Sequence, residues 1–351
     1  MILSAFSIFA MACFAGLLSS FFKQTPAVGR TLYVIIACIL ILFVATRELG
    51  SDQDSIAYAN YFNFDDYAMS RVAEPTFLLI SRMARAISLQ EGLFWLFLAY
   101  AVMGVTIKFV AINKLTELKW LSVIVYISSY YLLHEFTQIR AGVASGLLLL
   151  AIKPIADRNI VKFLGLIFAA SLFHYSAAVA LPLYFLSNSP LDKKTILVLL
   201  SIIPLGTLIR LSNFDILTSI PIELVRIKID TYSAVEKIRD LKLNVFNALY
   251  LTRYAMLYLF MIFSKSIQER SPYFPILIKV YAISMFSYLA LSQNAVFAMR
   301  ISELFGIVEI ILVPLLFYSI KPRILPTAFV LIFAAVSMGF NIYWAELVRN
   351  V

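Results

Sequence analysis

Residues 31–75 read TLYVIIACILILFVATRELGSDQDSIAYANYFNFDDYAMSRVAEP, an apolar run followed by an acidic, aromatic segment. The apolar part, 31–46, has no charged residue and approaches the length of about 20 residues with which a helix crosses a bilayer. The segment after it contains two arginines and six carboxylates: Glu48, Asp52, Asp54, Asp65, Asp66 and Glu74. The junction predicts a membrane helix that ends at a polar, water-facing segment.

The same apolar character extends along the whole chain. Of its 351 residues, 62% are hydrophobic and 14% are charged, whereas soluble domains have about 45–50% and about 25%. We therefore expect an all-α integral membrane protein, a polytopic helical bundle that forms a single domain over 1–351. The net charge of +9 comes from Lys and Arg in short loops. No stretch is basic enough to follow a phosphate backbone, so we expect no nucleic-acid partner.

Apolar runs predict about 12 membrane helices. Ten of them are single runs, at roughly 3–22, 31–46, 92–112, 119–134, 139–155, 195–210, 246–264, 272–291, 301–320 and 325–344. The other two come from the longer apolar stretch 161–188, which we expect to form a short-helix hairpin. Its turn is predicted at Phe173-His174-Tyr175-Ser176.

Basic loops fix the predicted orientation, because short cytoplasmic loops are enriched in Lys and Arg. Loops 23–30 and 113–119 have an excess of Lys and Arg, which places the acidic segment 47–75 outside. Only one span can then connect that segment to 113–119, so 76–90 is expected to be a re-entrant or interfacial helix. The same alternation requires 161–188 to go out and return, and it places the long polar segment 211–245 outside.

Polar residues are predicted to gather at this outer face in four groups. They are Arg47 with Asp52, Asp54, Tyr58 and Tyr61; Glu135 with Gln138 and Arg140; His174; and Arg300 with Glu303. Ionisable residues at such depths are expected to be functional. Three arginines from three helix ends, Arg47, Arg140 and Arg300, form a natural clamp for phosphate or pyrophosphate.

The clamp has no Gly-rich phosphate loop beside it, so a lipid-linked pyrophosphate is a better donor than a soluble nucleotide. Deprotonation of an attacking hydroxyl then needs a base, either His174 or one of Asp52 and Asp54. Tyr58 and Tyr61 are expected to hold sugars. The two histidines and two cysteines of the chain form no metal-ligand motif, so we expect no metal and no cofactor.

Simpler roles and other functions compete with this interpretation. Arg47 could be an interfacial anchor, Arg300 could pair with Glu303 one turn away, and His174 could cap a helix end.

The main alternatives to an enzyme that joins lipid-linked sugars are a flippase or transporter of lipid-linked oligosaccharide and an O-antigen ligase-like glycosyltransferase. An acyltransferase is a further one. A transporter needs a polar path open to both faces, whereas this chain concentrates polar groups at one.

The ordered motifs resemble those of EpsG-like, Wzy-type O-antigen and polysaccharide polymerases. The resemblance rests on RELGSDQDSIAYANYF with Glu74-Pro75, on Ile139-Arg140 with Ala144, on Phe173-His174-Tyr175-Ser176 before Leu181-Pro182, and on Arg300-Ile301. Either Asp52 or Asp54 matches the acidic position of the family. Ala141 stands where a polar residue is common.

The resemblance implies a bacterial inner-membrane glycosyltransferase with its active site on the periplasmic side. Its substrates would be oligosaccharide repeat units linked to undecaprenyl pyrophosphate. Its product would be O-antigen, capsule or exopolysaccharide. A flippase, a chain-length regulator and membrane lipid would be its partners. The site residues that fall within these motifs are Arg47, Glu74, Arg140, His174 and Arg300, and the polar group of Arg300 adds Glu303 as a candidate substrate contact.

Overall fold

The computed structural model describes residues 2–21, 26–63, 74–219, 229 and 243–349, and all regular structure within them is helical. Parts of the expected outer segments 47–75 and 211–245, including Asp65 and Asp66, lie outside the described residues. The chain divides into two compact units, Met1–Leu181 with Ile310–Val351, and Pro182–Glu309. The single domain expected from composition stays a prediction.

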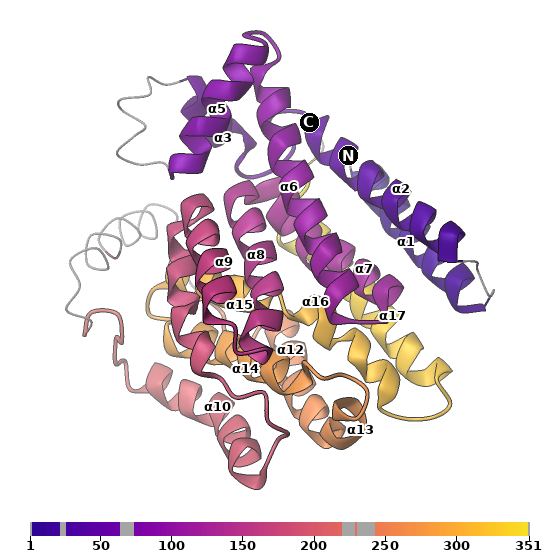
Figure 1. Cartoon of the computed structure of the whole chain (residues 1–351). Helices are drawn as coiled ribbons and strands as arrows, with labels where there is room; N and C mark the ends of the chain where they lie inside the picture. The colour runs from indigo at the N-terminus through magenta and orange to yellow at the C-terminus, as the bar shows by residue number, and fades with distance from the viewer. Residues whose placement is uncertain (1, 22–25, 64–73, 220–228, 230–242, 350–351) are drawn as a thin grey trace. The chain divides into compact units, whose positions relative to one another are not determined.

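The first unit is built around α6, which packs against α2, α5 and α8 (Figure 1). Its helices are α1 (Ile2–Phe21), α2 (Pro26–Ala45), α3 (Ser55–Asn63), α5 (Pro75–Ile87), α6 (Gly92–Leu115), α7 (Lys119–Tyr126), the π-helix η1 (Ile127–Thr137), α8 (Ile139–Ala156), α9 (Ile160–Phe173), η3 (Pro314–Tyr318), α17 (Ile324–Gly339) and η4 (Phe340–Trp344). The segment η2 (Tyr175–Phe185) and α16 (Glu309–Leu312) contain the boundaries between the units.

The antiparallel pair of α8 and α9 positions the site. The two helices pack together along their lengths and are joined by a short turn at 157–159. Asn159 begins α9 by accepting a hydrogen bond from the Lys162 amide at 3.0 Å, as a helix N-cap does. Because the helices are antiparallel, the first turn of α8 and the last turn of α9 lie at the same end. Arg140 and His174 occupy these two positions.

A glycine lets α8 approach the π-helix η1 closely. A Cβ atom at Gly142 would lie 2.5 Å from the carbonyl oxygen of His134 and 2.6 Å from Oε2 of Glu135. Only a residue without a side chain fits such a contact. The small residues that follow Arg140 thus permit close helix packing.

In the second unit, α14 packs against α10, α12 and α15 (Figure 1). The helices are α10 (Lys193–Leu211), α12 (Ala248–Ile262), α13 (Ser264–Gln268), α14 (Phe274–Ala290) and α15 (Ala295–Gly306). Asp192 and Asn247 begin α10 and α12 as N-caps, accepting the amides of Thr195 at 2.8 Å and Tyr250 at 3.1 Å.

Fewer helices than expected are long and apolar enough to be membrane spans in the part of the chain that the structure describes. Among the described residues, five helices are long and apolar enough to cross a bilayer, or six if the bent pair α15 with Glu309–Tyr318 counts as one span. The expected count of about 12 is therefore not confirmed. Several predicted runs are shorter or interrupted: 246–264 and 272–291 give helices of 15 and 17 residues, and 119–134 is divided between α7 and η1.

Two expected short elements are present. The stretch 76–90 forms the separate helix α5, whose 13 residues extend about 20 Å, too short to cross a bilayer. The stretch 161–188 breaks at His174, where α9 ends and the backbone is extended before η2. The return of η2 across a membrane stays a prediction.

The acidic segment after Arg47 is more ordered than a loop. It contains α3, which the composition of the segment did not predict. Oδ1 of Asp52 accepts the amides of Asp54 and Ser55, both at 2.8 Å, and so starts the helix. The buried carboxylate of Asp52 thus caps a helix within this polar segment, and Tyr58 and Phe62 of that helix are buried in the core.

Candidate functional site

The carboxylate of Glu74 joins two residues that the sequence analysis selected separately. Glu74 directly precedes α5, whose first residue, Pro75, suits a helix start. Its Oε2 forms an ion pair with Nη1 of Arg140, and its Oε1 lies 3.1 Å from Nδ1 of His174. We call Glu74, Arg140 and His174 the Glu74 cluster. The start of α5, the start of α8 and the end of α9 contribute one residue each.

The Glu74 cluster is shielded but reachable. The side chains of Glu74, His174 and Arg140 are 7%, 14% and 22% exposed, so Arg140 is the most accessible of the three. Burial by itself raises the pKa of Glu74. The hydrogen bond from His174 and the charge of Arg140 outweigh it and lower the pKa to about 2. Glu74 is therefore a carboxylate at neutral pH.

An ionised Glu74 fixes the tautomer of His174. A carboxylate can only accept, so Nδ1 of His174 carries the proton and donates it to Glu74. In the neutral ring, Nε2 is then the nitrogen with the lone pair. The cluster thus combines an oriented base with a guanidinium, one on each oxygen of the same carboxylate.

Aromatic rings complete the surroundings of Arg140. The centre of its guanidinium lies 5.6 Å from the ring of Tyr58 and 5.6 Å from the ring of Phe77. Both rings are buried, at 4% and 1% exposed. Such faces stabilise a cation while leaving its N–H groups to other partners. Tyr58 was expected to hold sugar, and the structure places its ring against Arg140.

Arg47 and Asp52 lie inside the first unit. Nε of Arg47 is 3.5 Å from Oδ2 of Asp52, and both side chains are fully buried. The guanidinium stacks on the ring of Phe97 at 3.7 Å and donates to the carbonyl oxygens of Glu135, at 3.2 Å, and Phe136, at 2.5 Å. Arg47 is thus no exposed interfacial anchor. It connects the end of α2 to the π-helix η1.

The other predicted residues of the first unit lie around these two pairs. Asp54 donates its amide to Asp52 and is half-buried, as is Tyr61, which packs against the core beside Tyr58. Gln138 forms the junction between η1 and α8, where its amide donates to the carbonyl oxygen of Leu133 at 2.8 Å. Arg300 and Glu303 lie half-buried in α15 of the second unit. Their place beside Arg140 stays a prediction.

A buried ion pair that the sequence patterns did not predict lies beside this site. Nζ of Lys108 lies 2.6 Å from Oε1 of Glu135 and 2.6 Å from the carbonyl oxygen of Gly142. Tyr126 donates to the same Glu135 oxygen at 2.7 Å. The contact with Gly142 fixes the backbone two residues after Arg140. The sequence did contain a signal for this ion pair, because Lys108 is an ionisable residue inside the predicted span 92–112.

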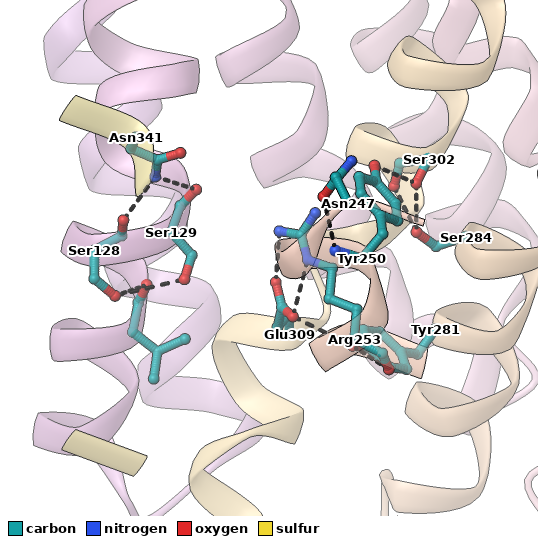
Figure 2. Close-up of polar contacts among 11 residues, drawn as sticks. Ser128, Ser129, Asn247, Tyr250, Arg253, Tyr281, Ser284, Ser302, Glu309 and Asn341 are labelled. Carbon is teal, nitrogen blue, oxygen red and sulfur yellow. Dashed lines mark hydrogen bonds and ion pairs between the residues drawn. The ribbon is translucent and has the colours of Figure 1, made fainter. Parts of the chain in front are cut away.

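The second unit has its own buried polar cluster, shown in Figure 2. Nη2 of Arg253 lies 3.0 Å from Oε2 of Glu309, and Nε lies 3.3 Å from Oε1. Tyr281 donates to Glu309 at 3.3 Å. This bidentate pair, whose residues lie in the predicted spans 246–264 and 301–320, was not predicted from the sequence either.

Figure 2 also shows a polar contact within the first unit. Asn341 donates a hydrogen bond to the carbonyl oxygen of Ser128 at 2.7 Å and so joins η4 to η1.

Comparison with family models gives one match that covers most of the chain. The EpsG family matches residues 30–348, a range that includes the Glu74 cluster, Arg47, Lys108 and Arg300. Comparison with curated proteins and with solved structures found no match.

Proposed function

We propose, since the chain belongs to the EpsG family of Wzy-like polysaccharide polymerases, that it is a glycosyltransferase joining lipid-linked repeat units into polysaccharide. The donor would be a glycan chain on undecaprenyl pyrophosphate. The acceptor would be a hydroxyl at the non-reducing end of an incoming unit. The product would be O-antigen, capsule or exopolysaccharide.

The observation that carries the proposal is the bridging of Arg140 and His174 by one carboxylate. Glycosyl transfer from a pyrophosphate needs a cation for the leaving group and a base for the acceptor. The carboxylate of Glu74 contacts both a cation, the guanidinium of Arg140, and a base, the imidazole of His174. Arg140, at 22% side-chain exposure, is the group through which an anion can be contacted.

In the proposed step, the acceptor oxygen forms a bond to the anomeric carbon of the donor glycan. The bond between that carbon and the pyrophosphate oxygen breaks, and its electron pair leaves with the lipid pyrophosphate. Nε2 of His174 takes the acceptor proton, and Glu74 stabilises the resulting imidazolium, as the carboxylate of a catalytic triad does. Arg140 balances the charge that develops on the leaving group.

The remaining predicted residues take supporting roles in the proposal. Tyr58 supports Arg140 through its ring. Asp52 holds Arg47 and starts α3, so His174 is the preferred base over Asp52 and Asp54. Gln138 and Tyr61 flank the site as candidate sugar contacts. Arg300 and Glu303 are proposed as a second contact for pyrophosphate.

The proposal places this chemistry on the periplasmic side of the bacterial inner membrane. Support comes from the Lys- and Arg-rich loops, which predict that the opposite end faces the cytoplasm. A flippase would deliver the substrate, and a chain-length regulator would act on the product.

Deletion of the chain in its host tests the function. A polymerase predicts surface glycan that ends after a single repeat unit. Complete absence of the glycan would instead indicate a flippase. Full-length polymer that accumulates on its lipid carrier would indicate a ligase. Either of these two outcomes would overturn the proposal.

A further inference from the structure

A basic pocket lies at the other end of the helices that carry the Glu74 cluster. It has a volume of about 410 Å³ and lies among the last turns of α6 and α8 and the first turns of α9. Arg140 and His174 occupy the start of α8 and the end of α9. Because α8 has 18 residues, the two places are about 25 Å apart along the helix.

Three lysines and one carboxylate line this pocket: Lys114, Lys153, Lys162 and Asp157. Lys153 lies 3.0 Å from Asp157, which leaves an excess of two positive charges in the lining. The three lysines come from three different helices and line one volume. This donor set fits a phosphate-bearing anion better than a cation or a neutral ligand.

The rest of the lining and the adjoining surface are apolar. Leu150, Pro154 and Leu166 form the pocket wall. Val161, Leu164 and Phe168, one above another on α9, are 77%, 45% and 68% exposed. An exposed apolar stripe that leads away from a basic pocket matches a ligand with a charged head and hydrocarbon chains.

We propose that this pocket binds the headgroup of an anionic phospholipid, with its acyl chains along the exposed face of α9. Basic pockets between membrane helices on the cytoplasmic side are suited to such headgroups. The loop 113–119, which borders the pocket, is predicted to be cytoplasmic, and the bordering loop 156–162 is basic in the same way, with Arg158 and Lys162 against Asp157. The bound lipid would hold α6, α8 and α9 together at the end opposite the Glu74 cluster.

Gly165 offers a way to block the pocket without disturbing the protein. It lines the pocket, and a Cβ atom there would meet nothing within 4 Å. Gly165→Phe therefore puts a ring into the ligand volume at little cost to the fold. Gly339, in α17, also has nothing within 4 Å of a Cβ. Gly339→Phe is the matched control.

The test uses the purified, delipidated full-length protein and its thermal unfolding midpoint. Phosphatidylglycerol should raise the midpoint in a concentration-dependent way, as a ligand of the folded state does. Phosphatidylethanolamine and inorganic phosphate should not. Lys114→Gln with Lys162→Gln should weaken the apparent affinity for phosphatidylglycerol on the order of 10-fold. Lys193→Gln with Lys194→Gln, two exposed lysines of α10, should not.

Gly165→Phe should weaken the same affinity, while Gly339→Phe leaves it unchanged. Equal effects of phosphatidylglycerol and phosphatidylethanolamine would overturn the proposal. If inorganic phosphate alone raises the unfolding midpoint as much as phosphatidylglycerol does, the proposal is also overturned, and the pocket is a site for a free anion. Unaltered phosphatidylglycerol binding by Gly165→Phe would place the lipid elsewhere.

Discussion

Nδ1 of His174 lies 3.1 Å from Oε1 of Glu74, although the two residues are 100 positions apart in the chain. The contact forms because α9 ends beside the start of α5, and the first turn of α8 reaches the other oxygen of the same carboxylate. One carboxylate thereby holds the imidazole of His174 and the guanidinium of Arg140 in fixed positions.

Arg140→Lys should lose most polymer formation. Lys keeps the positive charge but lacks the planar fork that binds two oxygens at once, so charge alone should not restore activity. The readout is the length distribution of surface glycan on a gel. Arg349→Lys is the control, because Arg349 pairs with Glu346 at 3.8 Å on an exposed surface. Wild-type polymer from Arg140→Lys would remove the phosphate role of Arg140.

His174→Gln should lower the rate of polymerisation by about 10²–10⁴-fold, the usual contribution of a general base. Gln can still hydrogen-bond to Glu74 but cannot take a proton at neutral pH. Tyr175→Phe alters the exposed neighbouring residue and should retain activity. If His174→Gln retains wild-type polymerisation while His174→Ala unfolds, His174 is only structural.

Glu74 should contribute to stability throughout the neutral range and lose this contribution in acid. Its pKa is about 2 in the folded protein against an ordinary value of 4.5. The contribution, about 3 kcal/mol for such a difference, is thus present above pH 4.5 and is lost as the pH falls toward 2. The measurement is the unfolding midpoint of the wild type minus that of Glu74→Gln across pH.

That difference should not fall as the pH is lowered from about 8 to 6, because neither the folded nor the unfolded carboxyl of Glu74 titrates there, and protonation of His174 can only strengthen its contact with the carboxylate. Glu346→Gln, at an exposed position, should show little difference at any pH. A wild-type advantage that already falls between pH 8 and 6 would contradict the ionised state assigned to Glu74.

The helical class and the grouping of Arg140 with His174 could be predicted because both follow from local sequence. Apolar runs indicate membrane helices, and an antiparallel pair brings its two ends together. The number of spans could not be predicted in this way. Hydropathy does not register where a π-helix or a proline-containing 3-10 segment interrupts a run, as in η1 and η2.

The buried ion pairs were missed for a different reason. A single lysine in an otherwise apolar helix hardly changes its average hydropathy, so Lys108 does not interrupt the predicted span 92–112. Its partner Glu135 was expected in an outer segment, whereas it is 3% exposed and 27 positions away along the chain. Which residues form a buried ion pair depends on how the helices pack against one another, and the periodicity of the sequence does not show this packing.

Removal of one member of the Lys108–Glu135 pair should be strongly destabilising. Lys108→Met leaves the carboxylate of Glu135 buried without its cation, which typically costs about 3–5 kcal/mol. The double variant Lys108→Met with Glu135→Gln should recover much of the loss. Unfolding midpoints of the two variants test this. Arg349→Met, which breaks an exposed pair, should change the midpoint little, and an equal loss from it would contradict the argument.

Cysteine labelling tests the predicted orientation of α9. In a background with Cys13→Ala and Cys38→Ala, Tyr175→Cys should react with a membrane-impermeant reagent from the periplasm. Val161→Cys, at the other end of α9, should react only after the membrane is opened. Both positions are exposed, at 51% and 77%. Reversed accessibility would place the Glu74 cluster on the cytoplasmic side.

Reconstitution of the purified protein with its lipid-linked repeat unit tests the central claim most directly. The reaction contains only protein, lipid and substrate, and a gel of the released glycan counts the joined units. We predict a ladder of products from the wild type and from Tyr175→Phe. Only the single unit should remain with His174→Gln or Arg140→Lys. A wild type that makes no ladder, or a ladder that persists in both variants, would contradict the account.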